Sequence, residues 1–234
     1  MRKGLGFALF CALAVPFAVR ANLVLDGSFE GQVATQPFQT FYAPSSFGAW
    51  TVTAGSIDLI NGYWAAAEGN QSVDLSGTSR GTIQQTVNIP GGSYHLTFEL
   101  SGNSDGPPTV KTVLVSLGGV SAQFSFTIPS GNNQNMHWVS ESWDVYLPAG
   151  GNTVLSFADI SDLSATPNAY GAALDNISLT SSPVPETSTF LAGACLMIPL
   201  GLSALRILWR TRAKLAFAQV RSWTRPMVLI GKLG

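Results

Sequence analysis

The chain has almost no cysteine, and neither of its two thiols lies in the central part of the sequence. Cys11 belongs to an apolar run near the start, and Cys195 belongs to an apolar run near the end. The segment between them can therefore hold no disulfide and no cysteine-ligated zinc site. Its fold has to be stabilised by a hydrophobic core.

Positive charge is also scarce in this central segment. Between Asn22 and Ser182 two basic residues, Arg80 and Lys111, stand against twelve acidic ones, a formal net charge of −10. An acidic surface repels phosphate, which excludes nucleic acid as a partner of this segment. From Arg206 onward the balance reverses, because this part of the chain has basic residues and no acidic ones.

The sequence lacks the usual catalytic motifs. It has no GxSxG, no HExxH and no glycine-rich phosphate loop. His95 lies in the strand-like stretch YHLTFEL, where we expect an inward-facing ring with a hydrogen-bond partner. We expect no enzymatic activity. Carboxylate pairs such as Glu141 and Asp144 leave glycoside hydrolysis open as an alternative.

The first 21 residues have the order of a secretory signal peptide. Arg2 and Lys3 precede an apolar run, and the small residue Ala21 stands just before the expected cleavage site. The run is short for a membrane span, which needs about 20 apolar residues. We therefore exclude residues 1–21 from the folded domain, which we place at residues 22–181.

Strand patterns fill this domain, and helical periodicity is almost absent. The predicted strands are 50–53, 56–60, 72–75, 82–89, 94–100, 112–117, 122–128, 138–146, 153–157 and 173–180. Gly-, Pro- and Asn-rich turns separate them, for example Pro90-Gly91-Gly92. This pattern predicts an all-β fold, an antiparallel β-sandwich, with Trp50 in its core.

The two ends of the domain carry the most specific resemblance. The start NLVLDGSFE, the stretch AAAEGNQSVDLSG and the closing GAALDNISLT resemble the choice-of-anchor C family of bacterial surface proteins. The resemblance implies a galactose-binding-like jelly roll, related to carbohydrate-binding modules. Asp26 stands where the family usually has Asn, a nearly isosteric change that should leave the fold intact.

The same resemblance implies a structural calcium ion. In jelly rolls of this kind the Glu after the first GxF and an Asp near the start of the last strand share the ion, and Glu30 and Asp175 match these positions. Calcium prefers several oxygen ligands and is abundant outside the cytoplasm. The alternative is that Asp175 caps a turn and Glu30 is solvated.

The segment after the domain resembles a PEP-CTERM sorting signal, which an exosortase processes in Gram-negative bacteria that secrete exopolysaccharide. Val184, Pro185 and Glu186 match its motif within the linker 182–187, and Thr187 departs from the usual Pro. Residues 188–209 form a run long enough for a transmembrane helix if Arg206 extends to the interface.

The basic residues after this run predict its orientation. Arg206, Arg210 and Arg212 form the expected stop-transfer cluster and favour a cytoplasmic location for the tail, residues 210–234. The tail continues beyond the point where such signals usually end. Either it lies amphipathically on the inner membrane surface, or it is an inert extension.

Aromatic residues are the candidate sugar contacts, because rings stack on the apolar faces of sugars. We expect Tyr63 and Trp64 to be exposed in the stretch NGYWAAAEGNQ, and His137 and Trp138 flank a polar loop. The sequence thus predicts an exported surface protein that binds polysaccharide. A structural or adhesive matrix component without a small ligand is the alternative.

Overall fold

The computed structural model describes residues 20–129, 135–162, 169–182 and 209. The chain divides into two compact units, Met1–Pro183 and Val184–Gly234, and Trp209 is the one described residue of the second unit. Residues 1–19 of the expected signal peptide lie outside the described residues, as do the sorting motif and all but one residue of the expected membrane helix. The stop-transfer arginines Arg206, Arg210 and Arg212 and the tail 210–234 also lie outside them. Within the described part of the chain, no helix has the length and apolarity needed to cross a membrane.

The first unit is built of twelve β-strands. They are β1 (Phe38–Tyr42), β2 (Ser45–Phe47), β3 (Trp50–Ala54), β4 (Ser56–Asn61), β5 (Gln71–Asp74), β6 (Thr82–Ile89), β7 (Gly92–Gly102), β8 (Val110–Leu117), β9 (Val120–Thr127), β10 (Val139–Leu147), β11 (Gly151–Asp159) and β12 (Ala172–Ser181). Each of the ten predicted strands corresponds to one of β3 to β12. Strands β1 and β2 were not predicted from the sequence.

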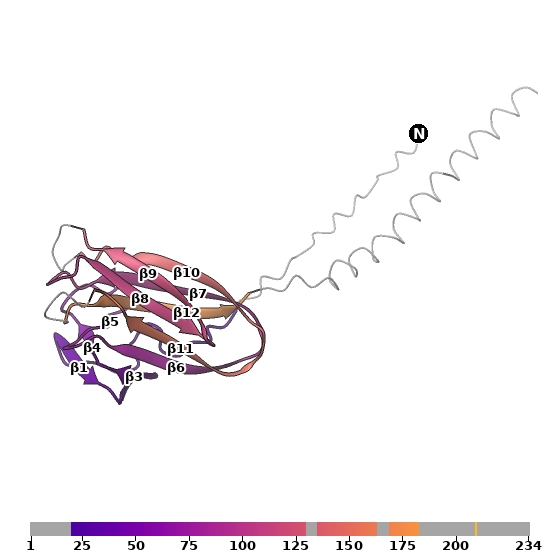
Figure 1. Ribbon diagram of the computed structural model, residues 1–234, viewed down its shortest axis with the longest axis horizontal. Helices are drawn as coiled ribbons and strands as arrows, with labels where there is room; N and C mark the ends of the chain where they lie inside the picture. Colours follow the sequence, from indigo (N-terminus) through magenta and orange to yellow (C-terminus); the bar gives the residue numbers. More distant parts are fainter. Residues whose placement is uncertain (1–19, 130–134, 163–168, 183–208, 210–234) are drawn as a thin grey trace, which may run out of the picture. The chain divides into compact units, whose positions relative to one another are not determined.

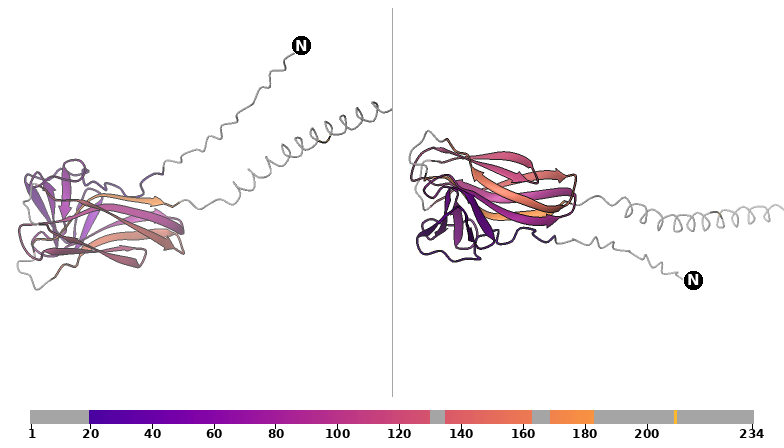
Figure 2. Two further views of the ribbon diagram at one scale, coloured as in Figure 1. Left: turned by 90° about the horizontal axis from the view of Figure 1, so that it is seen from above. Right: turned by 60° about the horizontal axis from the view of Figure 1, so that its bottom comes forward.

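The strands form two antiparallel sheets of six strands each (Figure 1). Sheet 1 has the order β1-β4-β5-β12-β7-β10, and sheet 2 has the order β2-β3-β6-β11-β8-β9. From β6 onward the chain alternates between the sheets, except at the β8–β9 hairpin, so that most connections cross from one sheet to the other. Two turned views show the two layers (Figure 2). The predicted antiparallel β-sandwich is confirmed.

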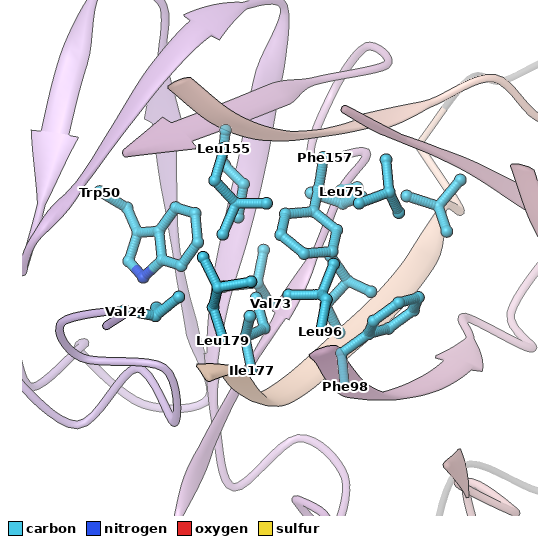
Figure 3. Packing of buried hydrophobic residues seen from close by; sticks show 14 of the residues in the cluster. Val24, Trp50, Val73, Leu75, Leu96, Phe98, Leu155, Phe157, Ile177 and Leu179 are labelled. Carbon is cyan, nitrogen blue, oxygen red and sulfur yellow. The ribbon is translucent and has the colours of Figure 1, made fainter. Parts of the chain in front are cut away.

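The main core fills the space between the sheets (Figure 3). Trp50 of β3 and Phe98 of β7 both pack against Phe157 of β11, with ring centroids 6.1 and 5.4 Å apart. Trp50 and Phe157 are fully buried, which confirms the prediction for Trp50. Strand alternation supplies the rest of this core, because every second residue of the central strands points inward.

The same alternation corrects the expectation for His95. Its neighbours Tyr94 and Leu96 are buried in the core, so His95 lies on the outer face of sheet 1. There its Nδ1 is 2.7 Å from Oδ1 of Asp144, its cross-strand partner on β10. The ring has a hydrogen-bond partner as expected, but it faces outward.

A second, smaller cluster covers part of the outer face of sheet 1. Leu59 and Leu174 point into the main core, whereas their neighbours Ile60 and Ala173 belong to this second cluster with Trp64 and Met136. Adjacent strand residues point to opposite faces, so the two loops that carry Trp64 and Met136 fold back over the outer face. These loops bring side chains from distant parts of the sequence to one side of the sandwich.

Candidate functional site

A cleft of about 350 Å³ opens beside this second cluster. Its wall is formed by β1, β4 and several loops. The lining residues are Phe38, Thr40, Asp58, Ile60, Tyr63, Trp64, Gly77, Thr78, Asn103, Asp105, Ala169 and Tyr170. The volume lies within the range of small-molecule sites in proteins. The cleft combines aromatic rings with carboxylate, amide and hydroxyl groups.

Two paired strands place one carboxylate in the cleft. Thr40 of β1 lies opposite Asp58 of β4, and the Thr40 hydroxyl donates a hydrogen bond of 2.5 Å to Asp58 Oδ1. Partial burial raises the pKa of Asp58, and the bond from Thr40 opposes this rise. The carboxylate is therefore oriented by its neighbour and only partly solvated.

Three aromatic rings line up along one wall. Tyr63 packs edge to face against Phe38, with ring centroids 5.9 Å apart, and against Trp64, with centroids 5.7 Å apart. The Tyr63 hydroxyl donates a 2.6 Å hydrogen bond to Asp105 Oδ2. Phe38 is 42% exposed and Trp64 only 3%. The three rings thus run from the buried Trp64 through the half-buried Tyr63 to the exposed Phe38.

A buried polar network lies beneath the cleft. Asp74 is opposite Asp58 on the neighbouring strand and is fully buried. Asn103 Nδ2 donates to Asp74 Oδ2 over 2.8 Å, and the N–H groups of Ser76 and Gly171 donate to Oδ1 over 2.8 and 3.0 Å. Burial raises the pKa of Asp74 to about 8, against the opposing effect of the hydrogen bonds from Asn103 and Ser76. This network fixes Asn103, which borders the cleft.

Lys111 is the cation of the network, and its side chain is fully buried. Its Nζ donates to the carbonyl oxygen of Gly106 over 3.0 Å and to that of Tyr170. Burial lowers the pKa of Lys111 to about 8, and the charges of Asp74 and Asp159 oppose this. Asp105 precedes Gly106, so one ammonium group joins the two loops that supply Asp105 and Tyr170 to the cleft.

Glycine allows these loops to approach closely. A Cβ on Gly106 would lie 2.2 Å from the ring of Tyr170, and a Cβ on Gly171 would lie 2.6 Å from Asp159 Oδ2. Asp159 is itself buried, and it accepts hydrogen bonds from the Ser76 hydroxyl and the Ser161 N–H, both at 2.7 Å. The network therefore ties both loops to the ends of β5 and β11.

The structure separates the four predicted sugar contacts. Tyr63 lines the cleft, but the expectation that Trp64 is exposed is wrong. The loop folds back over sheet 1, which buries the Trp64 ring, and its Nε1 donates to the Ser72 hydroxyl over 2.8 Å. Trp138 is partly buried against the same cluster, and its Nε1 donates to the Ala65 carbonyl over 3.0 Å.

His137 lies outside the lining of the cleft. It is exposed, with a φ of 50°, and it borders a small separate cavity of about 10 Å³, room for one water molecule. Its N–H donates to Asn135 Oδ1 over 3.2 Å. Of the four candidates, Tyr63 and the largely buried Trp64 line the cleft.

Glu30 and Asp175, the expected calcium ligands, contact the same loop. Asp175 Oδ2 accepts hydrogen bonds from the N–H groups of Ala67 and Glu68, both at 2.8 Å. Glu30 Oε1 accepts from the next part of the loop, the N–H groups of residues 70 and 71, at 2.6 and 2.8 Å. The two carboxylates thereby hold the loop that begins with Tyr63 and Trp64.

The oxygen atoms around Glu30 and Asp175 match the ligand set of a calcium ion only in part. Across the described residues, no group of three or more His, Cys, Asp and Glu side chains converges as a metal site. N–H groups face both Asp175 oxygens. Calcium takes six to eight oxygen ligands, so main-chain carbonyls would have to supply most of them. Burial raises the pKa of Asp175 to about 7, and the Glu68 charge adds to this rise.

Most of the cleft was not predicted from the sequence. The predicted sugar contacts did not include Phe38, Asp58, Asn103, Asp105 or Tyr170. The available signal was the alternation in β4, which places Asp58 on the face opposite Leu59. The other residues meet through long-range contacts that no local pattern records.

Fold and cleft together define a class: a β-sandwich domain of two antiparallel sheets with an aromatic and acidic cleft on the outside of one sheet. The chain belongs to the family described as "Protein of unknown function (DUF642)", whose pattern matches residues 22–180. The match covers all twelve strands except the last residue of β12.

Several known proteins are similar to this chain. Halomucin of Haloquadratum walsbyi is 29% identical over 175 residues, which is 72% of this chain and 2% of halomucin, so the chain spans a very small part of that relative. Among solved structures, TmCBM61 in complex with β-1,4-galactotriose has 15% identity and a TM-score of 0.43, covering 69% of this chain and 99% of that one. The CBM22-1 xylan-binding domain of Paenibacillus barcinonensis Xyn10C has 11% identity and a TM-score of 0.42, covering 65% and 99%.

Proposed function

We propose that this domain is a non-catalytic module that binds polysaccharide in the cleft. The observation that carries the proposal is the cleft itself, where the rings of Phe38, Tyr63 and Tyr170 lie beside the polar groups of Asp58 and Asp105. Sugar rings present apolar faces that pack on aromatic side chains and hydroxyl groups that bond to carboxylates and amides. The cleft offers both kinds of contact.

The two carboxylates of the cleft are positioned to accept hydrogen bonds from a sugar. Asp58 accepts a hydrogen bond from Thr40, and Asp105 accepts one from Tyr63 and has its N–H bonded to Asn103. Both groups are thus held in place as acceptors. Glycoside hydrolysis needs a carboxylic acid and a carboxylate that flank the scissile bond. Incubating the protein with a glycan that it binds tests this alternative. A glycan that stays intact after long incubation would support the binding function.

The test is affinity electrophoresis of the full-length chain in non-ionic detergent, through gels that contain a panel of bacterial and plant polysaccharides. Tyr63→Ala should abolish retardation, because it removes the central ring of the wall. Tyr63→Phe keeps the ring and loses only the bond to Asp105, so it should retain most of the binding. Tyr146→Ala is the matched control, since Tyr146 is 66% exposed on β10 and does not line the cleft.

Retardation that survives Tyr63→Ala would contradict the proposed site. A folded protein that no polysaccharide retards would contradict the binding function, and a structural or adhesive role in the extracellular matrix would then take its place. Thermal melting of each variant distinguishes loss of binding from loss of fold.

We also propose that the chain is an exported surface protein of the choice-of-anchor C type. The support lies in the sequence: the signal-like residues 1–21, the Val184-Pro185-Glu186 motif, the apolar run 188–209 and the arginines after it. An exosortase would then process the chain at the membrane of a Gram-negative host. Replacing Pro185 and Glu186 by Ala should leave the chain in the membrane fraction, and unchanged processing would contradict the assignment.

Calcium at Glu30 and Asp175 is a further proposal about stability. Asp175 is fully buried, and the described cations Arg20, Arg80 and Lys111 bond elsewhere. A bound cation would offset the buried negative charge and close the loop at residues 67–71. Calcium at about a hundred times its dissociation constant would stabilise the domain by about 2.7 kcal/mol. Asp175→Asn should remove a calcium-dependent rise in Tm, and a rise that survives this change would contradict the assignment.

A further inference from the structure

We infer that the cleft selects uncharged glycan chains and rejects glycans that carry carboxylate or sulfate groups. The inference rests on the proposed function, because it names the chemical class of the ligand of the same site. Three observations support it: the charges that line the cleft, the positions of the Lys and Arg side chains among the described residues, and the hydrogen-bonding capacity of the lining groups.

The charged groups of the cleft lining are of one sign. Asp58 lies in the cleft at the outer face of sheet 1, and Asp105 lies on the loop after β7, so the two charges enter from different elements. Among the described lining residues there is no Lys, Arg or His. An anionic sugar in the cleft would meet two like charges and no opposite one.

The Lys and Arg side chains in the part of the chain that the structure describes do not compensate the negative charge of Asp58 and Asp105. The ammonium group of Lys111 is buried beneath the cleft, where it donates to the carbonyl oxygens of Gly106 and Tyr170. It is also accompanied there by the buried carboxylates of Asp74 and Asp159. Arg80 binds the Ser161 carbonyl, and Arg20 binds Ser181. None of the three lines the cleft.

The hydrogen-bonding capacity of the cleft points the same way. An ionised carboxylate only accepts hydrogen bonds, so Asp58 and Asp105 can bond to donor groups of a ligand and not to its acceptor groups. Hydroxyl groups of a neutral sugar donate hydrogen bonds, whereas the carboxylate of a uronic acid and the sulfate of a sulfated sugar only accept them. Such a group next to Asp58 would lose its water and gain no hydrogen bond from that carboxylate.

The size of the expected effect follows from charge separation in a partly buried site. Two like charges a few ångströms apart near a protein surface repel strongly enough to weaken binding by about tenfold or more at low salt. Salt screens this repulsion. The difference between neutral and anionic polymers should therefore narrow as the ionic strength rises.

The test uses one polymer in two charge states. The full-length chain is first run through the polysaccharide panel, and a neutral polymer that retards it is then oxidised at its primary hydroxyls to give the corresponding uronic acid polymer. We expect the dissociation constant from the gels to rise by about tenfold or more on oxidation. The backbone linkage stays the same, so the change reports on charge.

Variants show whether the two carboxylates cause the rejection. Asp58→Asn and Asp105→Asn should each restore part of the binding to the oxidised polymer. Asp144→Asn is the matched control, because it makes the same change in net charge at an exposed position outside the cleft, where Asp144 bonds to His95. This control should bind the oxidised polymer as poorly as the wild type does.

The outcomes separate the inference from the function on which it rests. If only anionic polymers retard the protein, or if the neutral and oxidised polymers bind equally, the inference is overturned and polysaccharide binding stands. If no polymer retards a protein that melts cooperatively, both fail. Relief by Asp144→Asn equal to that by Asp58→Asn would show that net charge, and not the cleft, causes the rejection, and would overturn the inference.

Discussion

Replacing Lys111 by methionine should be among the most destabilising single changes in the domain. Methionine has nearly the shape of the lysine side chain and no charge, so the change removes the ammonium group with little loss of volume. Lys111 is fully buried on β8 and donates to the carbonyl oxygens of Gly106 and Tyr170. Those oxygens lose their partner in the variant.

The magnitude follows from what the ammonium group leaves behind. Each buried carbonyl without a partner costs about 1–3 kcal/mol. Removing one partner of a buried charge network costs about 3–5 kcal/mol, because the buried carboxylate of Asp159 loses the cation near it. These costs overlap, so we expect a loss of about 3–5 kcal/mol, a large part of the stability of an ordinary domain.

Urea unfolding measured by tryptophan fluorescence gives this number, since Trp50 reports on the core. Thr112→Ala on the same strand is the control, because the Thr112 side chain faces outward, where its hydroxyl bonds to the Ser125 hydroxyl over 3.0 Å, and the main-chain bonds of Thr112 are kept in the variant. It should cost less than about 1 kcal/mol. Adding Asp159→Asn to Lys111→Met should recover part of the loss.

The opposite result would refute the reasoning. Burial lowers the pKa of Lys111 to about 8, which shows that desolvation of the ammonium group opposes folding. If desolvation outweighed the bonds to Gly106 and Tyr170, Lys111→Met would be as stable as the wild type or more stable. The cleft loops would then not depend on the network beneath them.

Three further predictions concern single residues. Because burial raises the pKa of Asp74 to about 8 from the ordinary 3.8, the folded state holds a proton that the unfolded chain releases. The free energy of unfolding should therefore fall by up to about 1.4 kcal/mol per pH unit between about pH 5 and about pH 8. Asp74→Asn should flatten this slope in urea titrations, and an unchanged slope would contradict the assignment. Trp64→Ala should cost about 3–5 kcal/mol and expose the loop over sheet 1 to proteases, whereas wild-type stability would show that the ring is not buried. Asp26→Asn should raise Tm, because Asp26 Oδ2 is buried without a hydrogen-bond partner and the change removes its charge; a lower Tm would contradict this.

The strands were predictable where local alternation is strong. In β6 and β8 buried residues alternate with half-buried or exposed ones without a break, so a pattern of period two identifies them. The missed strand β1 has no such pattern, since Phe38 and Tyr42 are exposed and the residues between them are half-buried. Strand β2 has three residues, too few to show a period.

The cleft was less predictable, because its parts meet only in three dimensions. Thr40 and Asp58 are neighbours through the pairing of β1 with β4, and the strand β1 was not predicted. Lys111 joins loops that are more than 60 residues apart in the sequence. The burial of Trp64 depends on Met136 from a distant loop, which no pattern near Trp64 could reveal. Tyr63 was found because a paired aromatic in a polar stretch is itself a local signal.

The central claim is that this DUF642 domain binds polysaccharide in the cleft beside Tyr63. The measurement that tests it most directly is affinity electrophoresis of the full-length chain and its Tyr63→Ala variant through neutral polysaccharide gels, with the melting temperature of both proteins as the control. We expect at least one neutral polymer to retard the wild type and not the variant. A folded wild type that migrates freely through every gel, or a variant that is retarded as strongly as the wild type, would contradict the account.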